Sequence, residues 1–155
     1  MSLIGHPLPP FSLSDDQGGT VTPATLAGAW TVIYAYPRDA TPGCTTEACD
    51  FRDNWARVQA AGARVYGISK DSVASHQKFR AAQGLPFPLL SDPDKALLTA
   101  LGAFGKKIMY GKEVEGIIRS TFLVDPKGVI RHVWPKVSVK GHVQAVLDTL
   151  AKLAG

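Results

Sequence analysis

Hydrophobic positions recur along the chain with two different periods, which predict strands and helices in turn. Segments 30–36 (WTVIYAY) and 63–69 (ARVYGIS) are rich in β-branched and aromatic residues, as buried strands are. Between them, after the turn-forming segment 41–43, apolar residues recur at helical spacing: Ala48, Phe51, Trp55 and Val58. The pattern predicts a strand, a tight loop, a helix and a second strand.

Two hairpins are predicted from short alternating runs that flank polar turns. Segments 11–14 and 20–22 enclose a Gly-rich turn near the N-terminus. Segments 120–124 and 129–134 enclose Asp-Pro-Lys-Gly at 125–128, which places proline and glycine where a type I turn favours them.

Three more helices follow from apolar spacing and capping residues: from Asp71 or Ser72 to about Gln83, from 91–94 to about Leu101, and from about Gly141 to Leu153. Segment 86–90 contains too much proline for a central strand. Strands that alternate with helices, together with a late antiparallel hairpin, predict an α/β fold with a mixed sheet covered by helices on both faces.

Composition limits the classes of protein that the chain can represent. Its 155 residues, 45% of them hydrophobic, fit a single domain spanning 1–155. The net charge of +4 comes from scattered lysines and arginines without a basic cluster, so we expect no nucleic-acid partner. Prolines break up the N-terminal segment and no stretch is apolar enough to span a bilayer, so we expect a soluble, cytoplasmic protein without a membrane partner.

The two cysteines carry the most distinctive chemistry. Cys44 follows Thr41-Pro42-Gly43 at the predicted helix start, where unpaired N–H groups and the helix dipole favour a thiolate. Gly43 leaves the sulfur open to approach, and its N–H and that of Cys44 could hold an anionic or polar oxygen. The Thr41 hydroxyl can donate to the sulfur or to a substrate oxygen. Glu47 is expected in the first helical turn, near the positive end of the dipole.

Cys49 lies five residues after Cys44, which sets a constraint on any disulfide between them. In an unbroken helix the two Cα atoms are about 8.7 Å apart, beyond the roughly 7 Å limit for a disulfide. Pairing would therefore require the first helical turns to unwind. A zinc site is disfavoured because no histidine lies at ligand spacing from either cysteine. Two alternatives remain: Cys49 is an inert buried residue, or one cysteine forms a nucleophilic pair with a histidine. The four histidines are expected to be surface or hydrogen-bonded residues.

The cysteine segment resembles the peroxiredoxins, and within them the bacterioferritin comigratory protein or Q-type branch. Pro37, Thr41 and Cys44 match the Pro-x-x-x-Thr-x-x-Cys signature, and Cys49 matches the resolving cysteine of this branch. The likeness extends over most of the chain, through 10–13, 67–69, 89–92 and 116–125. The chain departs from the family pattern at Pro10, where the family often has aspartate, and at Arg38, where lysine is common.

The resemblance implies a thioredoxin-like fold and a thiol peroxidase that reduces hydrogen peroxide and organic hydroperoxides. Cys44 would be the peroxidatic cysteine and form a sulfenic acid, which Cys49 would resolve to an intramolecular disulfide that thioredoxin or a similar dithiol reductant reopens. No metal or cofactor is implied, and a monomer or weak homodimer is expected.

The resemblance also assigns supporting residues. Arg119 matches the catalytic arginine of the family, whose permanent charge would favour the Cys44 thiolate and stabilise the leaving oxygen. Glu47 matches a glutamate that orients this arginine, with a helix-dipole role as the alternative. Thr41 would hold the attacked oxygen.

Two other functions remain as alternatives. A thioredoxin-like dithiol oxidoreductase acting on protein disulfides would favour Cys-x-x-Cys, which the four residues between these cysteines do not match. A non-enzymatic, redox-sensing binding protein would leave Thr41 and Arg119 without a purpose.

Overall fold

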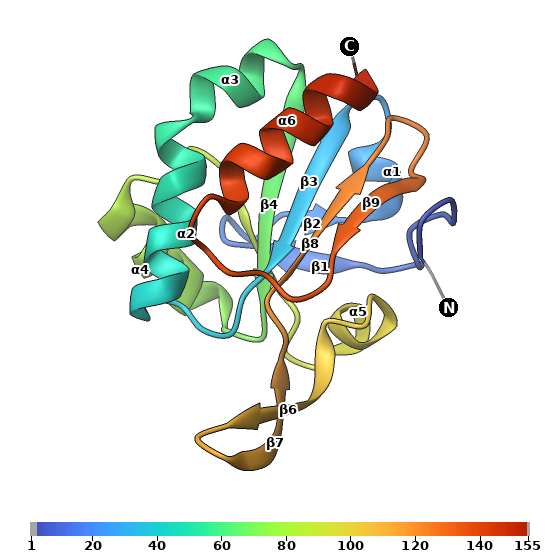
Figure 1. The fold of residues 1–155 in the computed structure, drawn as a ribbon. Coiled ribbons are helices and arrows are strands. Elements are labelled where there is room, and N and C mark those ends of the chain that lie inside the picture. Colours follow the sequence, from blue (N-terminus) through green and yellow to red (C-terminus); the bar gives the residue numbers. More distant parts are fainter. Residues whose placement is uncertain (1–2, 155) are drawn as a thin grey trace.

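A computed structural model describes residues 3–154, so the outermost positions of the predicted domain 1–155 lie outside the described residues. A seven-stranded sheet in the order β2-β1-β5-β4-β3-β8-β9 forms its centre (Figure 1). Its strands are β1 Leu13–Asp15, β2 Thr20–Val21, β3 Trp30–Ala35, β4 Ala63–Ser69, β5 Leu89–Ser91, β8 Ser120–Val124 and β9 Ile130–Trp134. The helices are α1 Pro23–Leu26, α2 Pro42–Asp53, α3 Trp55–Ala60, α4 Val73–Gln83, α5 Ala96–Ala100 and α6 His142–Ala154.

The sheet is mixed, as the sequence predicts. Strands β3, β4 and β5 are parallel and are joined by helical crossovers, whereas β8 pairs antiparallel with both β3 and β9. The N-terminal hairpin β1–β2 joins the sheet through an antiparallel pairing of β1 with β5. The predicted thioredoxin-like arrangement is confirmed, and the antiparallel pairing of β8 with β3 brings the chain after residue 118 beside the end of β3.

Alternate residues of each central strand enter different cores. Val32 and Tyr34 of β3 lie in a cluster with apolar residues of α2, α3, α4 and α6. Ile33 and Ala35 point to the other face, where α1 and α5 cover them. This alternation is the period of a strand whose two faces are both buried.

The expectation that 86–90 cannot enter a central strand is wrong for its last residues. Strand β5, Leu89–Ser91, lies inside the sheet between β1 and β4. Both prolines precede the strand, so they remove no N–H from its ladder, and Leu89 and Leu90 are fully buried.

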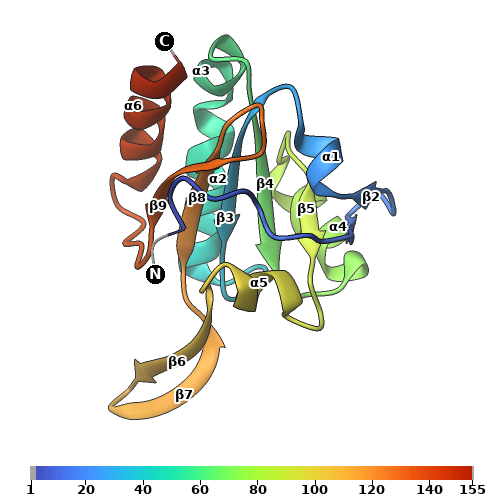
Figure 2. The same cartoon turned by 90° about the vertical axis from the view of Figure 1, so that its right-hand side faces the viewer.

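Two further features differ from the sequence-based expectations. The helix that carries the cysteines ends at Asp53, and α3 begins after Asn54. A second sheet, β6 Phe104–Met109 paired with β7 Lys112–Ile117, was missed. Its two-residue turn, Tyr110-Gly111, has φ of 52° and 77°, which is the left-handed backbone of a type I′ turn and a signal that the sequence contains. This hairpin stands away from the central sheet (Figure 2).

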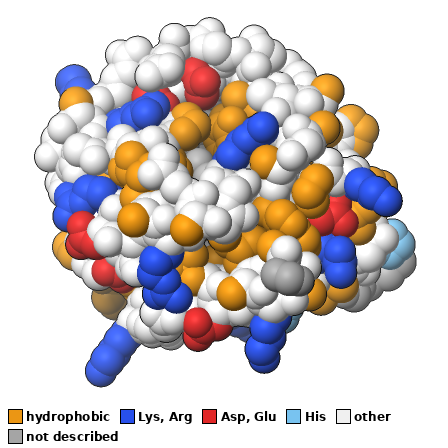
Figure 3. All heavy atoms as spheres, turned by 90° about the horizontal axis from the view of Figure 1, so that it is seen from above, with side chains coloured by type: hydrophobic (Ala, Val, Ile, Leu, Met, Phe, Trp, Pro, Cys, Tyr) orange, Lys and Arg blue, Asp and Glu red, His pale blue; other side chains and the backbone are white. Residues whose placement is uncertain are grey.

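On the face seen from above, positively and negatively charged side chains are not separated into distinct regions. Lysine and arginine side chains are spread among hydrophobic and acidic ones there (Figure 3). Within residues 3–154, no helix has the length and apolar character needed to cross a bilayer.

Candidate active site

Cys44 lies in the first turn of α2, directly behind the end of β3. Thr41 is the extended N-cap residue, Pro42 opens the helix, and the first helical bond runs from Thr45 N to Thr41 O. Among the described residues, no acceptor binds the N–H groups of Gly43 and Cys44, as expected at a helix start. The site therefore offers two backbone donors beside a thiol that is 1% exposed.

Arg119 approaches Cys44 from the segment that enters β8. Its Nη2 donates to Cys44 Sγ over 3.2 Å and its Nη1 donates to Glu47 Oε1 over 2.6 Å. Within residues 3–154 this is the single hydrogen bond to Sγ, so the Cys-His pair that the sequence left open is not formed. A Cβ at Gly43 would lie 3.3 Å from Nη2, so the glycine lets the guanidinium lie close to the helix.

Glu47 is the partner that holds Arg119. The carboxyl group is completely buried, and burial raises its pKa to about 7, although Arg119 acts to lower it. Glu47 lies in the second turn of α2, so the expectation of a first-turn position beside the dipole is wrong. Burial acts to lower the pKa of Arg119, but Glu47 and Cys44 outweigh it and the pKa is raised.

Thr41 and Pro37 lie in the loop that leads from β3 to α2. The Thr41 hydroxyl donates to the Arg38 carbonyl over 2.9 Å, so its proton is engaged and its lone pairs remain to accept a hydrogen bond. This differs from the expectation that the hydroxyl donates to the sulfur or to a substrate oxygen. Pro37 is half-buried directly after β3 and Tyr36, where the chain leaves the sheet.

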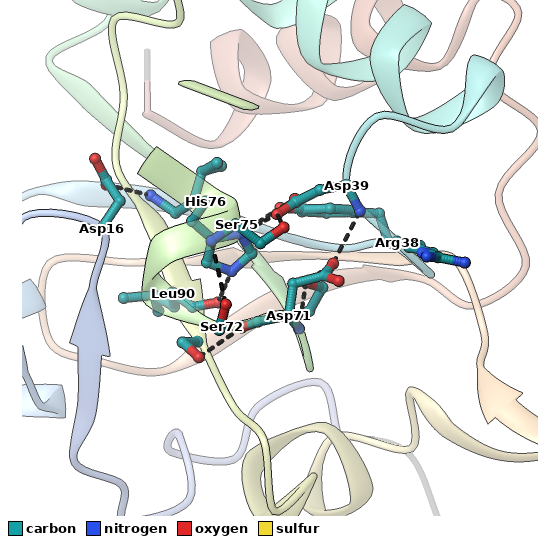
Figure 4. A network of polar contacts seen from close by, with 12 residues as sticks. Asp16, Arg38, Asp39, Asp71, Ser72, Ser75, His76 and Leu90 are labelled. Carbon is teal, nitrogen blue, oxygen red and sulfur yellow. Dashed lines mark hydrogen bonds and ion pairs between the residues drawn. The ribbon is translucent and has the colours of Figure 1, made fainter. Parts of the chain in front are cut away.

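A buried polar network, which the sequence analysis missed, holds this loop in place (Figure 4). The Asp39 carboxylate accepts from Tyr36 Oη at 2.6 Å and Ser75 Oγ at 2.8 Å, and lies 2.7 Å from His76 Nδ1. Its backbone N–H donates to Asp71 over 2.8 Å. Burial acts to raise the pKa of Asp39, but the hydrogen bonds from His76 and Tyr36 outweigh it and lower the pKa.

This network fixes the conformation of the residues before Cys44. His76 is fully buried and its Nε2 donates to the Leu90 carbonyl over 2.9 Å, which fits the expectation of a hydrogen-bonded histidine. Ala40, next to Asp39, takes a φ of 63°, a conformation that a residue with a Cβ adopts only when its surroundings impose it. Asp39, Asp71 and His76 are close enough together to hold a metal ion, but their contacts with one another and with hydroxyl groups already account for the cluster.

Cys49 lies on the same unbroken helix but faces elsewhere. Both cysteines are free thiols. Five residues of helix separate their side chains by about 140° around the axis and their Cα atoms by about 8.7 Å. Cys49 is half-buried, and its Sγ lies 3.5 Å from Gln83 Oε1 at the end of α4.

Comparison with known proteins agrees with this geometry. The model of the AhpC/TSA family matches residues 4–133. The chain belongs to this family. It is 52% identical to the peroxiredoxin Bcp of Xanthomonas campestris, covering 91% of this chain and 87% of that protein, and 44% identical to the peroxiredoxin Bcp of Bacillus subtilis, covering 97% and 96%.

Solved structures give the same result. The X. campestris bacterioferritin comigratory protein has a TM-score of 0.89 at 48% identity, covering 94% of this chain and 92% of that one. The Xylella fastidiosa PrxQ has a TM-score of 0.91 at 38% identity, covering 98% and 97%. The protein is a peroxiredoxin of the Bcp/PrxQ kind, and it is a thiol-dependent peroxidase that uses a peroxide substrate and a thiol reductant.

Proposed function

We propose that Cys44 is the peroxidatic cysteine and that Arg119, Thr41 and the N–H groups of Gly43 and Cys44 hold the peroxide against it. The Cys44 thiolate attacks one peroxide oxygen, the O–O bond breaks, and the other oxygen leaves with the electron pair and takes a proton as water or an alcohol. Cys44 is left as the sulfenic acid.

The contact of Arg119 with both Cys44 and Glu47 carries this proposal. One guanidinium N–H points at the sulfur, so the positive charge favours the thiolate and lies where negative charge moves during O–O cleavage. The other N–H is held by a buried carboxyl group, which fixes the guanidinium plane. Thr41 keeps its lone pairs free and accepts a hydrogen bond from the hydroxyl group of the bound hydroperoxide.

The second half of the cycle uses Cys49. The Cys49 thiol attacks the Cys44 sulfenic acid, an S–S bond forms, and water leaves. A dithiol reductant of the thioredoxin type then reduces this disulfide and returns both thiols. Because the free thiols of Cys44 and Cys49 must be regenerated after each cycle, we place the protein in the cytoplasm, where such reductants keep thiols reduced.

The substrates are proposed to include hydrogen peroxide and organic hydroperoxides. The X. campestris bacterioferritin comigratory protein, described as active in alkyl peroxide reduction, supports the organic class. We further propose one thioredoxin-like domain that acts as a monomer or weak homodimer, since three of the four exposed large apolar side chains of the described chain, Ile108, Met109 and Tyr110, lie together at the small β6–β7 tip.

The two single cysteine variants test the assignment. With hydroperoxide and a thioredoxin system, Cys44→Ser should consume no peroxide, and Cys49→Ser should complete one oxidation and then stop unless a small thiol is added. Full peroxide consumption by Cys44→Ser would refute the mechanism. Rapid insulin reduction without peroxide turnover would instead favour a dithiol oxidoreductase.

A further inference from the structure

The Cys49 side chain is hydrogen-bonded to Gln83, the last residue of α4. The Cys49 thiol donates to the Gln83 side-chain oxygen over 3.5 Å. One turn further along α2, Arg52 Nη1 donates to the Gln83 main-chain carbonyl over 2.7 Å. A single residue of α4 thus binds two positions on the same side of α2, one through its side chain and one through its backbone.

The end of α4 fixes Gln83 for this contact. Gly84 has a φ of 61° in the left-handed region and ends the helix directly after Gln83. The Gln83 carbonyl belongs to the last helical turn, whose carbonyls have no intrahelical partner, and the Arg52 guanidinium supplies one. Gln83 therefore presents its amide to Cys49 from a rigid position.

The two bonds differ in what happens to them when α2 unwinds. To reach Cys44, Cys49 must leave Gln83, because the helix places the two sulfurs on different sides. Arg52 need not leave, because it lies one turn beyond Cys49 and outside the turns between the two cysteines. A groove of about 520 Å³ is lined by α4, including Gln83, and by the loop before Cys44, at Arg38 and Ala40.

We propose that Gln83 is a positioning residue that retains the resolving thiol of Cys49 on the folded helix, so that release from Gln83 limits disulfide formation. This rests on the proposed function. The Cys44 sulfenic acid has two fates: Cys49 condenses with it to a disulfide with loss of water, or a second peroxide oxidises it to the sulfinic acid while that peroxide is reduced to water or alcohol. Retention of Cys49 by Gln83 slows the first fate and thereby favours the second.

The test compares Gln83→Ala with Gln77→Ala, an exposed position on the same helix. Tryptophan fluorescence after rapid mixing with hydrogen peroxide separates a peroxide-dependent oxidation phase from a peroxide-independent resolution phase. Since a weak thiol hydrogen bond corresponds to a factor of about 2–5 in an equilibrium, Gln83→Ala should speed resolution by about 2–5-fold and leave oxidation unchanged. The peroxide concentration that half-inactivates the enzyme should rise by the same factor, whereas Gln77→Ala should match the unaltered protein.

A second readout does not depend on peroxide turnover. In the reduced Cys44→Ser background, Gln83→Ala should raise the rate at which iodoacetamide alkylates Cys49 by a similar factor. Gln83→Met keeps the length of the side chain without its oxygen. It should reproduce both the faster resolution and the faster alkylation, and it serves as a control for a folding defect in the alanine variant.

Unchanged or slower resolution in both Gln83 variants, with normal oxidation, would overturn this proposal and leave the peroxidase mechanism intact. Absence of the oxidation phase in the unaltered protein would overturn the proposed function and this inference together.

Discussion

Glu47 should make the folded protein less stable as the pH rises from 4.5 to about 7. Its carboxyl group has an ordinary pKa of 4.5 that burial raises to about 7 in the folded protein. Between these values the folded state keeps a proton that the unfolded state has released. The stabilisation is therefore complete below pH 4.5 and is lost as the pH rises through about 7.

The magnitude follows from the size of that interval. Each pH unit between 4.5 and about 7 costs about 1.4 kcal/mol, so the whole interval costs about 3 kcal/mol. His142 has the opposite effect on stability over part of this pH range. Burial lowers its pKa from 6.5 to about 4 and keeps it neutral beside Thr121, so its contribution to the stability of the folded protein grows as the pH rises. Only a comparison with a variant at position 47 separates the two effects.

Glu47→Gln removes the titration and keeps an amide oxygen for Arg119. Urea unfolding at constant ionic strength, between pH 4.5 and 7.5, should show this variant gaining about 3 kcal/mol relative to the unaltered protein across the interval. Glu115→Gln, at an exposed position of the hairpin, should show no such gain. Parallel stability curves for Glu47→Gln and the unaltered protein would refute the reasoning.

Three further predictions concern the site and its scaffold. Arg119→Lys cannot keep both the Cys44 and the Glu47 contacts, so it should lower the rate constant for peroxide reduction about 10²–10³-fold in stopped-flow assays. A loss under threefold would contradict the role proposed for Arg119. Asp39→Asn replaces one of the two carboxylate oxygens by an amide N–H₂ group, so it cannot accept from Tyr36, Ser75 and His76 together and should cost about 2–3 kcal/mol in urea unfolding at pH 7. This cost should shrink as the pH falls towards 3.8 and below. Gly67→Ala would bring a Cβ to 2.8 Å from the side chain of Leu89 and should cost about 1–3 kcal/mol, whereas Gly105→Ala, which meets nothing within 4 Å, should cost less than 1 kcal/mol.

The local sequence determined most of the elements that build this site. Strand β4 occupies 63–69 as expected, Ser72 caps α4 by accepting from Ser75 N, and α4 ends at Gln83. Cys44 lies at a helix start because Pro42 suits the first helical position, directly after the extended N-cap residue Thr41. The distance and angle between the two cysteines on one helix likewise follow from their separation in the sequence alone.

Only the tertiary structure decided how Glu47 and Arg119 work together. From the sequence alone, Glu47 suited the helix dipole almost as well as an arginine partner, because local patterns do not show which face of α2 is buried. The antiparallel pairing of β8 with β3 brings Arg119 to the cysteine across 75 residues of chain. Burial then removes Glu47 from water and leaves the guanidinium as its partner.

The same reason explains the other features that the sequence did not show. The internal place of β5 depends on its pairing with both β1 and β4, which no local pattern contains. The contacts of Asp39 with His76 and of Cys49 with Gln83 join residues 37 and 34 positions apart, and they exist because α4 packs against the loop and helix that carry the cysteines. The sequence alone determined that Cys44 starts a helix with Cys49 on a different side of it, because helix geometry is local. Only the packing of distant elements decided which groups hold each thiol, because sheet order and burial are properties of the whole chain.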